Sequence, residues 1–214
     1  MADDKIPHNI YQISFMTHAH EIIAMGYQEL HAEDFANFQE PEITGELVRA
    51  MRGALERATA PDWAELYTIH DDPPLNAPGK RGKRRPRVDI EFERVKHGIR
   101  PRLRFEAKRL GKNHGVKPYL GKDGLGCFTS GRYPLTCPEA GMLGYIQSRD
   151  ETTWAAKIEG ALRKDPATYC VASGTQWEPH HITSRLAHTF RSKHQCPALG
   201  EDIYIFHVLL RFCT

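Results

Sequence analysis

The sequence predicts an α/β fold in which helices flank a central mixed β-sheet. Between residues 102 and 109, apolar side chains alternate with charged ones, as in a strand with one buried face. Residues 87–95 show the same alternation, and residues 203–210 form the continuous apolar run of a buried strand. Residues 41–58 and 150–164 instead place apolar side chains at helical spacing. Strands and helices that share one chain in this way are typical of a sheet covered by helices.

The predicted core runs from about residue 41 to residue 175 of a single domain spanning 1–214. It begins with the 41–58 helix, where Pro41 suits the first helical position. Strands are then expected near 64–70, 87–95 and 102–109, with a hairpin turn at His97-Gly98. The small residues of 138–148 favour a helix packed on the sheet, and 168–173 has the composition of a strand. Residues 1–40 form a helical N-terminal extension, and residues 176–214 add strands that complete the sheet.

Composition limits the class of protein. The chain has 214 residues and no run of 18 apolar residues, so no transmembrane helix is expected. Its first residues lack the pattern of a secretory signal. The five cysteines are an odd number without a close CxxC pair, which fits reduced thiols in a cytoplasmic protein and argues against a structural zinc site.

Positive charge is concentrated in one part of the chain. Residues 80–112 contain 14 Lys and Arg against 4 Asp and Glu, whereas the whole chain has a net charge of only +2. One interpretation is a solvated flexible loop, and the other is a surface that binds a polyanion. The candidate nucleic-acid-binding residues are Lys80, Arg81, Lys83, Arg84, Arg85, Arg87, Arg109 and Lys112.

Two predicted strands bring acidic and basic side chains to one polar face. Asp89 on the first strand, and Glu106 and Lys108 on the second, are expected to lie side by side. Mg²⁺ prefers oxygen ligands, and Asp89, Glu106 and the backbone carbonyl of Ala107 would supply them, with Mn²⁺ as a substitute. Lys108 would orient or help deprotonate a water and stabilise negative charge on phosphate. The alternative is an ordinary hairpin face with surface ion pairs.

The segments Arg87-Val-Asp89 and Phe105-Glu-Ala-Lys108 together resemble the motif of the PD-(D/E)XK nuclease superfamily. The resemblance covers about residues 42–173 and implies a restriction-endonuclease-like αβββαβ core. It implies Asp89 and Glu106 as metal ligands and Lys108 as the catalytic lysine. Either Glu42 or Glu46 would be the glutamate of the first helix, and Gln147 the polar residue of the next helix. The proline that precedes the motif aspartate is replaced by Val88.

The expected function is therefore metal-dependent cleavage of phosphodiester bonds, most simply in DNA, in bacterial defence, restriction or repair. A homodimer, or a partner subunit of a defence system, would suit cutting of both strands. The alternative is a non-catalytic nucleic-acid-binding or assembly subunit that keeps the nuclease fold. The sequence motif does not distinguish double-stranded DNA, single-stranded DNA and RNA as substrates.

Overall fold

The computed structural model describes residues 8–30, 35–95, 100–174 and 177–213. Its α-helices are α1 (His8–Gln28), α2 (Glu40–Leu55), α3 (Val116–Leu120), α4 (Gly126–Thr129) and α5 (Glu151–Lys164). Its strands are β1 (Tyr67–Asp71), β2 (Ile90–Arg94), β3 (Arg102–Leu110), β4 (Glu139–Ile146), β5 (Glu178–Pro179), β6 (Thr189–Cys196) and β7 (Glu201–Arg211). Short 3₁₀ helices cover Asp62–Leu66 and Gly82–Arg84. The hairpin turn expected at His97-Gly98 lies outside the described residues.

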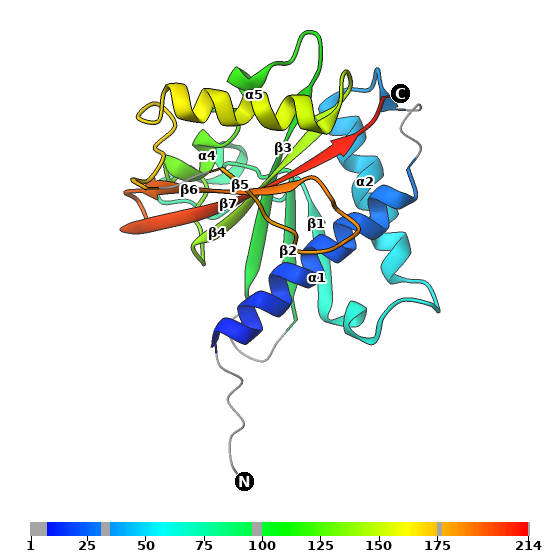
Figure 1. Ribbon diagram of the computed structural model, residues 1–214. Coiled ribbons are helices and arrows are strands. Elements are labelled where there is room, and N and C mark those ends of the chain that lie inside the picture. The colour runs from blue at the N-terminus through cyan, green and yellow to red at the C-terminus, as the bar shows by residue number, and fades with distance from the viewer. Residues whose placement is uncertain (1–7, 31–34, 96–99, 175–176, 214) are drawn as a thin grey trace.

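The strands form one mixed sheet in the order β1-β2-β3-β4-β7-β6-β5 (Figure 1). β1, β2 and β3 are antiparallel neighbours, whereas β3, β4 and β7 are parallel. β6 runs antiparallel to β7 and carries the short β5 at its outer edge. The predicted α/β class with a mixed sheet flanked by helices is confirmed.

Helices cover both faces of the sheet and create two hydrophobic cores. α1 and α2 lie on one face, where Ile22, Leu47 and Phe105 belong to the first core. α5 lies on the other face with α3 and α4 (Figure 1), and there Ile158 and Phe128 belong to the second core. Alternate residues of β3 point to opposite faces, so this strand separates the two cores. No helix among the described residues combines the length and apolar character needed to cross a bilayer.

The helix predicted at 138–148 is wrong, because this segment is β4 in the middle of the sheet. A parallel strand covered on both faces is apolar on both sides, so it lacks the alternation that identifies a strand with one solvated face. Its glycines serve strand packing: a Cβ on Gly141 would lie 2.0 Å from the ring of Phe105, and one on Gly144 would lie 2.7 Å from Leu209. The small residues therefore admit neighbouring side chains of the sheet.

One further prediction is corrected. Residues 168–173 form turns with a single bridge from Val171 to β6, because Cys170 adopts a positive φ of 53° that ends extended structure. Residues 121–132, although rich in glycine, contain α4 and bury Leu125 and Phe128. The helix at 150–164 and the strand at 203–210 are confirmed as α5 and β7, and β6 is a further strand of the 176–214 extension.

Candidate active site

Asp89 lies where β2 and β3 separate. The ladder between these strands ends at the pair Ile90 and Phe105, so Asp89 stands one residue beyond it. Its Oδ2 accepts a hydrogen bond of 2.6 Å from the backbone N–H of Ala107, where a strand carbonyl would otherwise be the acceptor. The carboxylate is thus fixed in the gap between the two strands, and Asp89 does not stand on the strand face that the alternation predicted.

Glu106 and Lys108 share one face of β3, as their spacing of two predicts. Glu106 is buried, with 5% of its surface exposed. Its Oε1 accepts a bond of 2.9 Å from the ammonium of Lys108. Its Oε2 lies 2.8 Å from the hydroxyl of Tyr133, which also lies 2.5 Å from the backbone carbonyl of Arg87. Lys108 and Tyr133 therefore hold the two carboxylate oxygens of Glu106 in place.

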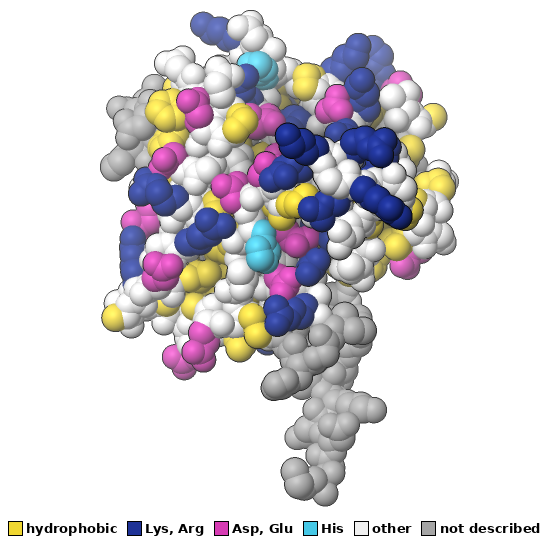
Figure 2. Space-filling model, turned by 180° about the vertical axis from the view of Figure 1, so that it is seen from behind, with side chains coloured by type: hydrophobic (Ala, Val, Ile, Leu, Met, Phe, Trp, Pro, Cys, Tyr) yellow, Lys and Arg dark blue, Asp and Glu magenta, His cyan; other side chains and the backbone are white. Residues whose placement is uncertain are grey.

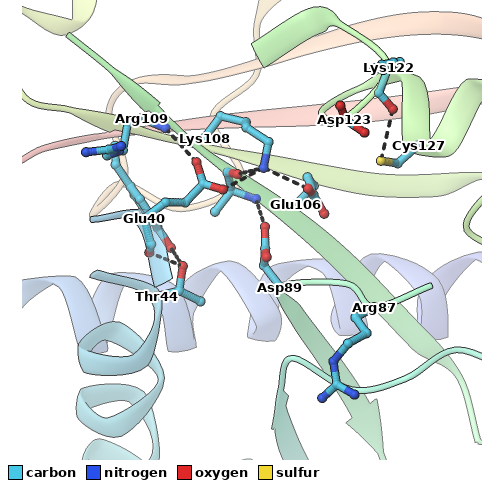
Figure 3. A network of polar contacts seen from close by, with 12 residues as sticks. Glu40, Thr44, Arg87, Asp89, Glu106, Lys108, Arg109, Lys122, Asp123 and Cys127 are labelled. Atoms are coloured by element: carbon cyan, nitrogen blue, oxygen red, sulfur yellow. Dashed lines mark hydrogen bonds and ion pairs between the residues drawn. The ribbon is translucent and has the colours of Figure 1, made fainter. Parts of the chain in front are cut away.

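Lys108 donates to three oxygens at once (Figure 3). Besides Glu106, its ammonium lies 2.6 Å from the carbonyl oxygen of Ala107 and 2.7 Å from Oε1 of Glu40. The second carboxylate oxygen of Glu40 accepts from the backbone N–H of Arg109 at 3.2 Å. Glu40 is the first residue of α2, so this bond joins the start of the helix to β3. We define Glu40, Asp89, Glu106 and Lys108 as the carboxylate–lysine cluster.

The glutamate that α2 contributes is thus Glu40, and neither Glu42 nor Glu46 reaches the cluster. Glu42 accepts a bond of 2.7 Å from the backbone N–H of Gln39 and caps the helix. Glu46 is on the surface, in an ion pair with Arg49. The prediction missed Glu40 because it began the helix at Pro41, one residue too late.

Gln147 follows β4 directly and lies on no helix. Its side-chain nitrogen donates to the carbonyl oxygens of Phe35 and Phe38, at 3.0 and 2.8 Å. Both acceptors belong to the segment that leads into Glu40. Gln147 therefore ties the end of the sheet to the entry of α2 and supports the position of Glu40, whereas no described contact joins it to Asp89 or Glu106.

Tyr133 is the residue of the site that the sequence did not reveal. It lies in a Gly- and Cys-containing segment without periodicity, 27 residues after Glu106. Its ring is buried against Phe128, and burial together with the nearby Glu106 raises the pKa of its hydroxyl far above the ordinary value. Tyr133 thus stays a protonated donor beside Glu106.

The acidic groups of the cluster outnumber its basic group, because three carboxyl groups face the single ammonium of Lys108. Burial raises the pKa of Asp89 to about 6, although the Ala107 N–H and Lys108 oppose the shift. Burial, followed by the charge of Asp89, raises the pKa of Glu106 to about 8. Burial alone would lower the pKa of Lys108, but the carboxylates of Glu106 and Glu40 outweigh it and the pKa is raised. Lys108 is therefore a cation at neutral pH. Its single positive charge does not neutralise all the carboxyl groups of the cluster when they are ionised.

The donor set of the cluster fits a hard divalent cation. Asp89, Glu106 and the carbonyl of Ala107 offer only oxygen, the ligand type that Mg²⁺ takes. The excess negative charge points the same way, because a cation would stabilise the ionised forms that burial disfavours. Two of these oxygens, on Glu106 and Ala107, now accept bonds from Lys108.

A basic groove of about 790 Å³ opens beside the cluster. Five of its lining side chains are cationic: Lys80, Arg84, Arg85, Arg87 and Arg132. The carbonyl of Arg87 is the one that Tyr133 contacts, which connects the groove to Glu106. Figure 2 shows Lys and Arg side chains gathered on one part of the rear face. Arg132 was not predicted for this surface, and Arg81 and Lys83 are exposed but do not line the groove.

A second group of possible ligands is already balanced by arginines. Atoms of His70, Glu91 and Glu93 lie within 4.8 Å of one another. However, Arg104 donates to Glu91 at 2.7 Å, and Arg100 and Arg102 bind Glu93 at 2.8 Å. Three guanidinium groups neutralise the two glutamates of this group, whereas the carboxylate–lysine cluster has one cation for three carboxyl groups.

Comparisons of the chain with protein-family models, with curated proteins and with solved structures found no match.

Proposed function

We propose that this chain is a metal-dependent nuclease that hydrolyses phosphodiester bonds, with DNA as the expected substrate. The observation that carries the proposal is the carboxylate–lysine cluster. Asp89 and Glu106 converge beside Lys108 (Figure 3). Burial raises the pKa of both carboxyl groups, and the charge of Asp89 raises that of Glu106 further, so a bound cation would stabilise their ionised forms. The basic groove next to Glu106 supplies the positive field that a phosphate backbone requires.

Asp89, Glu106 and the carbonyl of Ala107 would hold Mg²⁺, with Mn²⁺ able to replace it. When bound, such an ion neutralises charge on phosphate oxygens and makes a water molecule more acidic. The protein fixes the two carboxylate ligands without it: the Ala107 N–H holds Asp89, and Tyr133 holds Glu106. This preorganisation suits electrostatic stabilisation of a transition state.

Lys108 would act as a cation, because its carboxylate neighbours keep the ammonium protonated. From its place between Glu40 and Glu106 it can donate to a phosphate oxygen or orient an attacking water. Glu40 would be a positioning residue that holds Lys108 and the backbone of Arg109. The raised pKa of Lys108 argues against a role as general base at neutral pH, because the ammonium keeps its proton.

The order of elements supports the proposed relation to the PD-(D/E)XK superfamily. α2 precedes the antiparallel strands β1, β2 and β3, and α3 and α4 then lead to β4, which is parallel to β3. The resemblance implies one helix between the third and fourth strands. Here two short helices, α3 and α4, stand in that place, and the fourth strand is residues 139–146 and not 168–173. A setting in cytoplasmic bacterial defence, restriction or repair, as a homodimer or with a partner subunit, follows from the same resemblance.

The test is cleavage of plasmid, single-stranded DNA and RNA with Mg²⁺, Mn²⁺ or a chelator. Asp89→Asn keeps the acceptor for the Ala107 N–H but removes the charge, so we expect loss of metal-dependent cleavage with the fold intact. Glu46→Gln is a matched control, because it removes a carboxylate of the same helix that does not reach the cluster. Undiminished cleavage by purified Asp89→Asn would refute the assignment.

The alternative is a non-catalytic subunit that binds nucleic acid through the basic groove. One observation favours it: Lys108 already occupies Glu40, Glu106 and the Ala107 carbonyl, so these oxygens are satisfied without a metal. A non-catalytic subunit would bind DNA in a strongly salt-dependent manner and cleave no substrate with either metal.

A further inference from the structure

A second, smaller polar pocket lies at the ends of β3 and β4. Its volume is about 290 Å³, and we call it the β3-end pocket. The residues that line it are Ala36, Asn37, Arg109, Gly111, Lys112, Asn113, His114, Gln147 and Ser148. None of them is acidic, whereas Arg109 and Lys112 are cations. The chemistry of this lining favours a small anion.

Hydrogen bonds fix two walls of the pocket. Gly111 and His114 bond to each other through their backbones at 2.8 and 3.2 Å, and this tight turn presents Lys112 and Asn113 at its tip. On the opposite wall, Gln147 fastens the 35–38 segment through two hydrogen bonds. The pocket is thus formed where β3, β4 and the entry of α2 are held together.

Arg109 has unused donor capacity in this pocket. Its backbone N–H is held by Glu40, which fixes where the side chain begins. Among the described residues, Nη1 makes only a long bond of 3.4 Å to the carbonyl of Phe38, and the buried Nε has no hydrogen-bond partner. A buried guanidinium N–H without an acceptor costs free energy, and a bound oxyanion would supply that acceptor.

The pocket and the basic groove lie on opposite sides of the carboxylate–lysine cluster. Figure 3 shows Arg109 on one side of Lys108, Glu106 and Asp89, and Arg87 on the other. Arg109 lines the β3-end pocket, and Arg87 lines the basic groove. A chain of phosphates that crosses the cluster would meet positive charge both before and after the reacting bond.

We propose that the β3-end pocket binds one phosphate group of the polynucleotide, while the basic groove holds the chain on the other side of the cluster. The proposal rests on the proposed function, in that the ligand is the substrate of the same site. Its ligand is either an internal phosphate of the backbone or a terminal phosphate at a strand end. Both offer the oxyanion that Arg109 and Lys112 would receive.

The test is binding of a single-stranded DNA 12-mer to the full chain in a chelating buffer, measured by fluorescence anisotropy at several salt concentrations. The oligonucleotide carries a 5′-phosphate in one arm and a 5′-hydroxyl in the other. The variants are Arg109→Gln, which keeps the length of the stem, and Lys112→Ala at the exposed tip of the turn. Lys164→Ala is the matched control, since it removes one exposed cation at the end of α5.

We expect Kd to rise about tenfold in Arg109→Gln and about threefold in Lys112→Ala, with a shallower salt dependence. Lys164→Ala should bind like the wild type. An equal loss in both arms identifies an internal phosphate, and a loss confined to the 5′-phosphate arm identifies a terminal one. Wild-type affinity in both pocket variants, or no binding by the wild type, would overturn the proposal.

No cleavage occurs in this assay, so the two proposals fail separately. Binding that depends on Arg109, together with no cleavage in any metal, would keep the pocket and refute the nuclease. Metal-dependent cleavage, together with binding that is unchanged in Arg109→Gln and Lys112→Ala, would support the nuclease and refute the phosphate pocket. Because Lys112→Ala alters an exposed turn residue, its result does not depend on whether Arg109→Gln folds.

Discussion

The ammonium of Lys108 lies 2.9 Å from Oε1 of Glu106, one of the oxygens that would hold a metal ion. The same ammonium lies 2.6 Å from the carbonyl of Ala107, the second such oxygen. Lys108 thus supplies positive charge at the place where the proposed function requires a divalent cation. A bound ion and the ammonium would compete for these oxygens, and Lys108 would have to release them.

Removal of Lys108 should therefore strengthen metal binding while it abolishes cleavage. In Lys108→Met the competing charge is gone but the aliphatic volume is kept. We expect Mn²⁺ affinity, measured by calorimetry or by electron paramagnetic resonance, to rise several-fold. Unchanged or weaker Mn²⁺ binding in Lys108→Met would show that the ammonium does not share the ligands of the ion.

Glu106→Gln should make the protein more stable and inactive. Burial raises the pKa of Glu106 to about 8, so folding favours its protonated form. Stability from this group is complete below the unfolded pKa of about 4.5 and is lost as pH rises through about 8. Because the amide also gives up the pair with Lys108, we expect a gain of about 2 kcal/mol in the free energy of unfolding at pH 8.5.

Urea unfolding of Glu106→Gln and wild type at pH 5 and pH 8.5, in chelator, measures this difference. The gain should shrink toward pH 5, where the wild-type carboxyl is largely protonated in the folded state. A gain that is equal at both pH values would mean that ionisation of Glu106 is not its cause.

Glu40 and Glu46 belong to the same helix but should respond differently to loss of charge. Glu40→Gln weakens the hold on Lys108 and on the Arg109 backbone, so we expect cleavage to fall about 10- to 100-fold. Glu46→Gln affects a surface pair with Arg49 and should leave the rate within about twofold. Single-turnover cleavage with saturating Mg²⁺ compares them. Equal rates for Glu40→Gln and wild type would remove Glu40 from the site.

A buried chain of hydrogen bonds on the second face of the sheet should make stability depend on pH. The Ser192 hydroxyl lies 2.7 Å from Nε2 of both His194 and His207, and Tyr119 lies 3.0 Å from Nδ1 of His207. His194 Nδ1 completes the chain at the carbonyl of Tyr169. Every group has a partner if both imidazoles are neutral, with one N–H each.

Burial lowers the pKa of His194 to about 4 and that of His207 well below its ordinary value. Their contribution to stability is therefore complete above about pH 6.5, the unfolded value, and is lost as pH falls toward 4. His194→Asn should flatten the fall in unfolding free energy over this range, whereas the exposed His181→Asn should not. Identical pH profiles for His194→Asn and wild type would contradict this account.

The sequence was most informative where chemistry and periodicity coincided. The alternation in β3 placed Glu106 and Lys108 on one face, because a strand with charged side chains on one face and apolar ones on the other shows a period of two. Asp89 was also identified, but its position between the strands depends on where the β2–β3 ladder ends, and this is a tertiary property.

The other features were not predicted, because they arise from contacts between segments that are distant in the sequence or from the exact end of a helix. β4 is apolar on both faces and rich in small residues, so its pattern matched a helix equally well. Glu40 was missed through an error of one residue at a helix boundary. Tyr133 reaches Glu106 from a segment without periodicity, and only the folded chain brings the two together.

Cleavage of supercoiled plasmid by wild type and by Lys108→Ala, with Mg²⁺ and with chelator, tests the central claim most directly. The account predicts cleavage by the wild type that requires the metal, and at least a hundredfold loss in Lys108→Ala, which should keep the wild-type circular dichroism spectrum. Equal metal-dependent cleavage by the two purified proteins would contradict it.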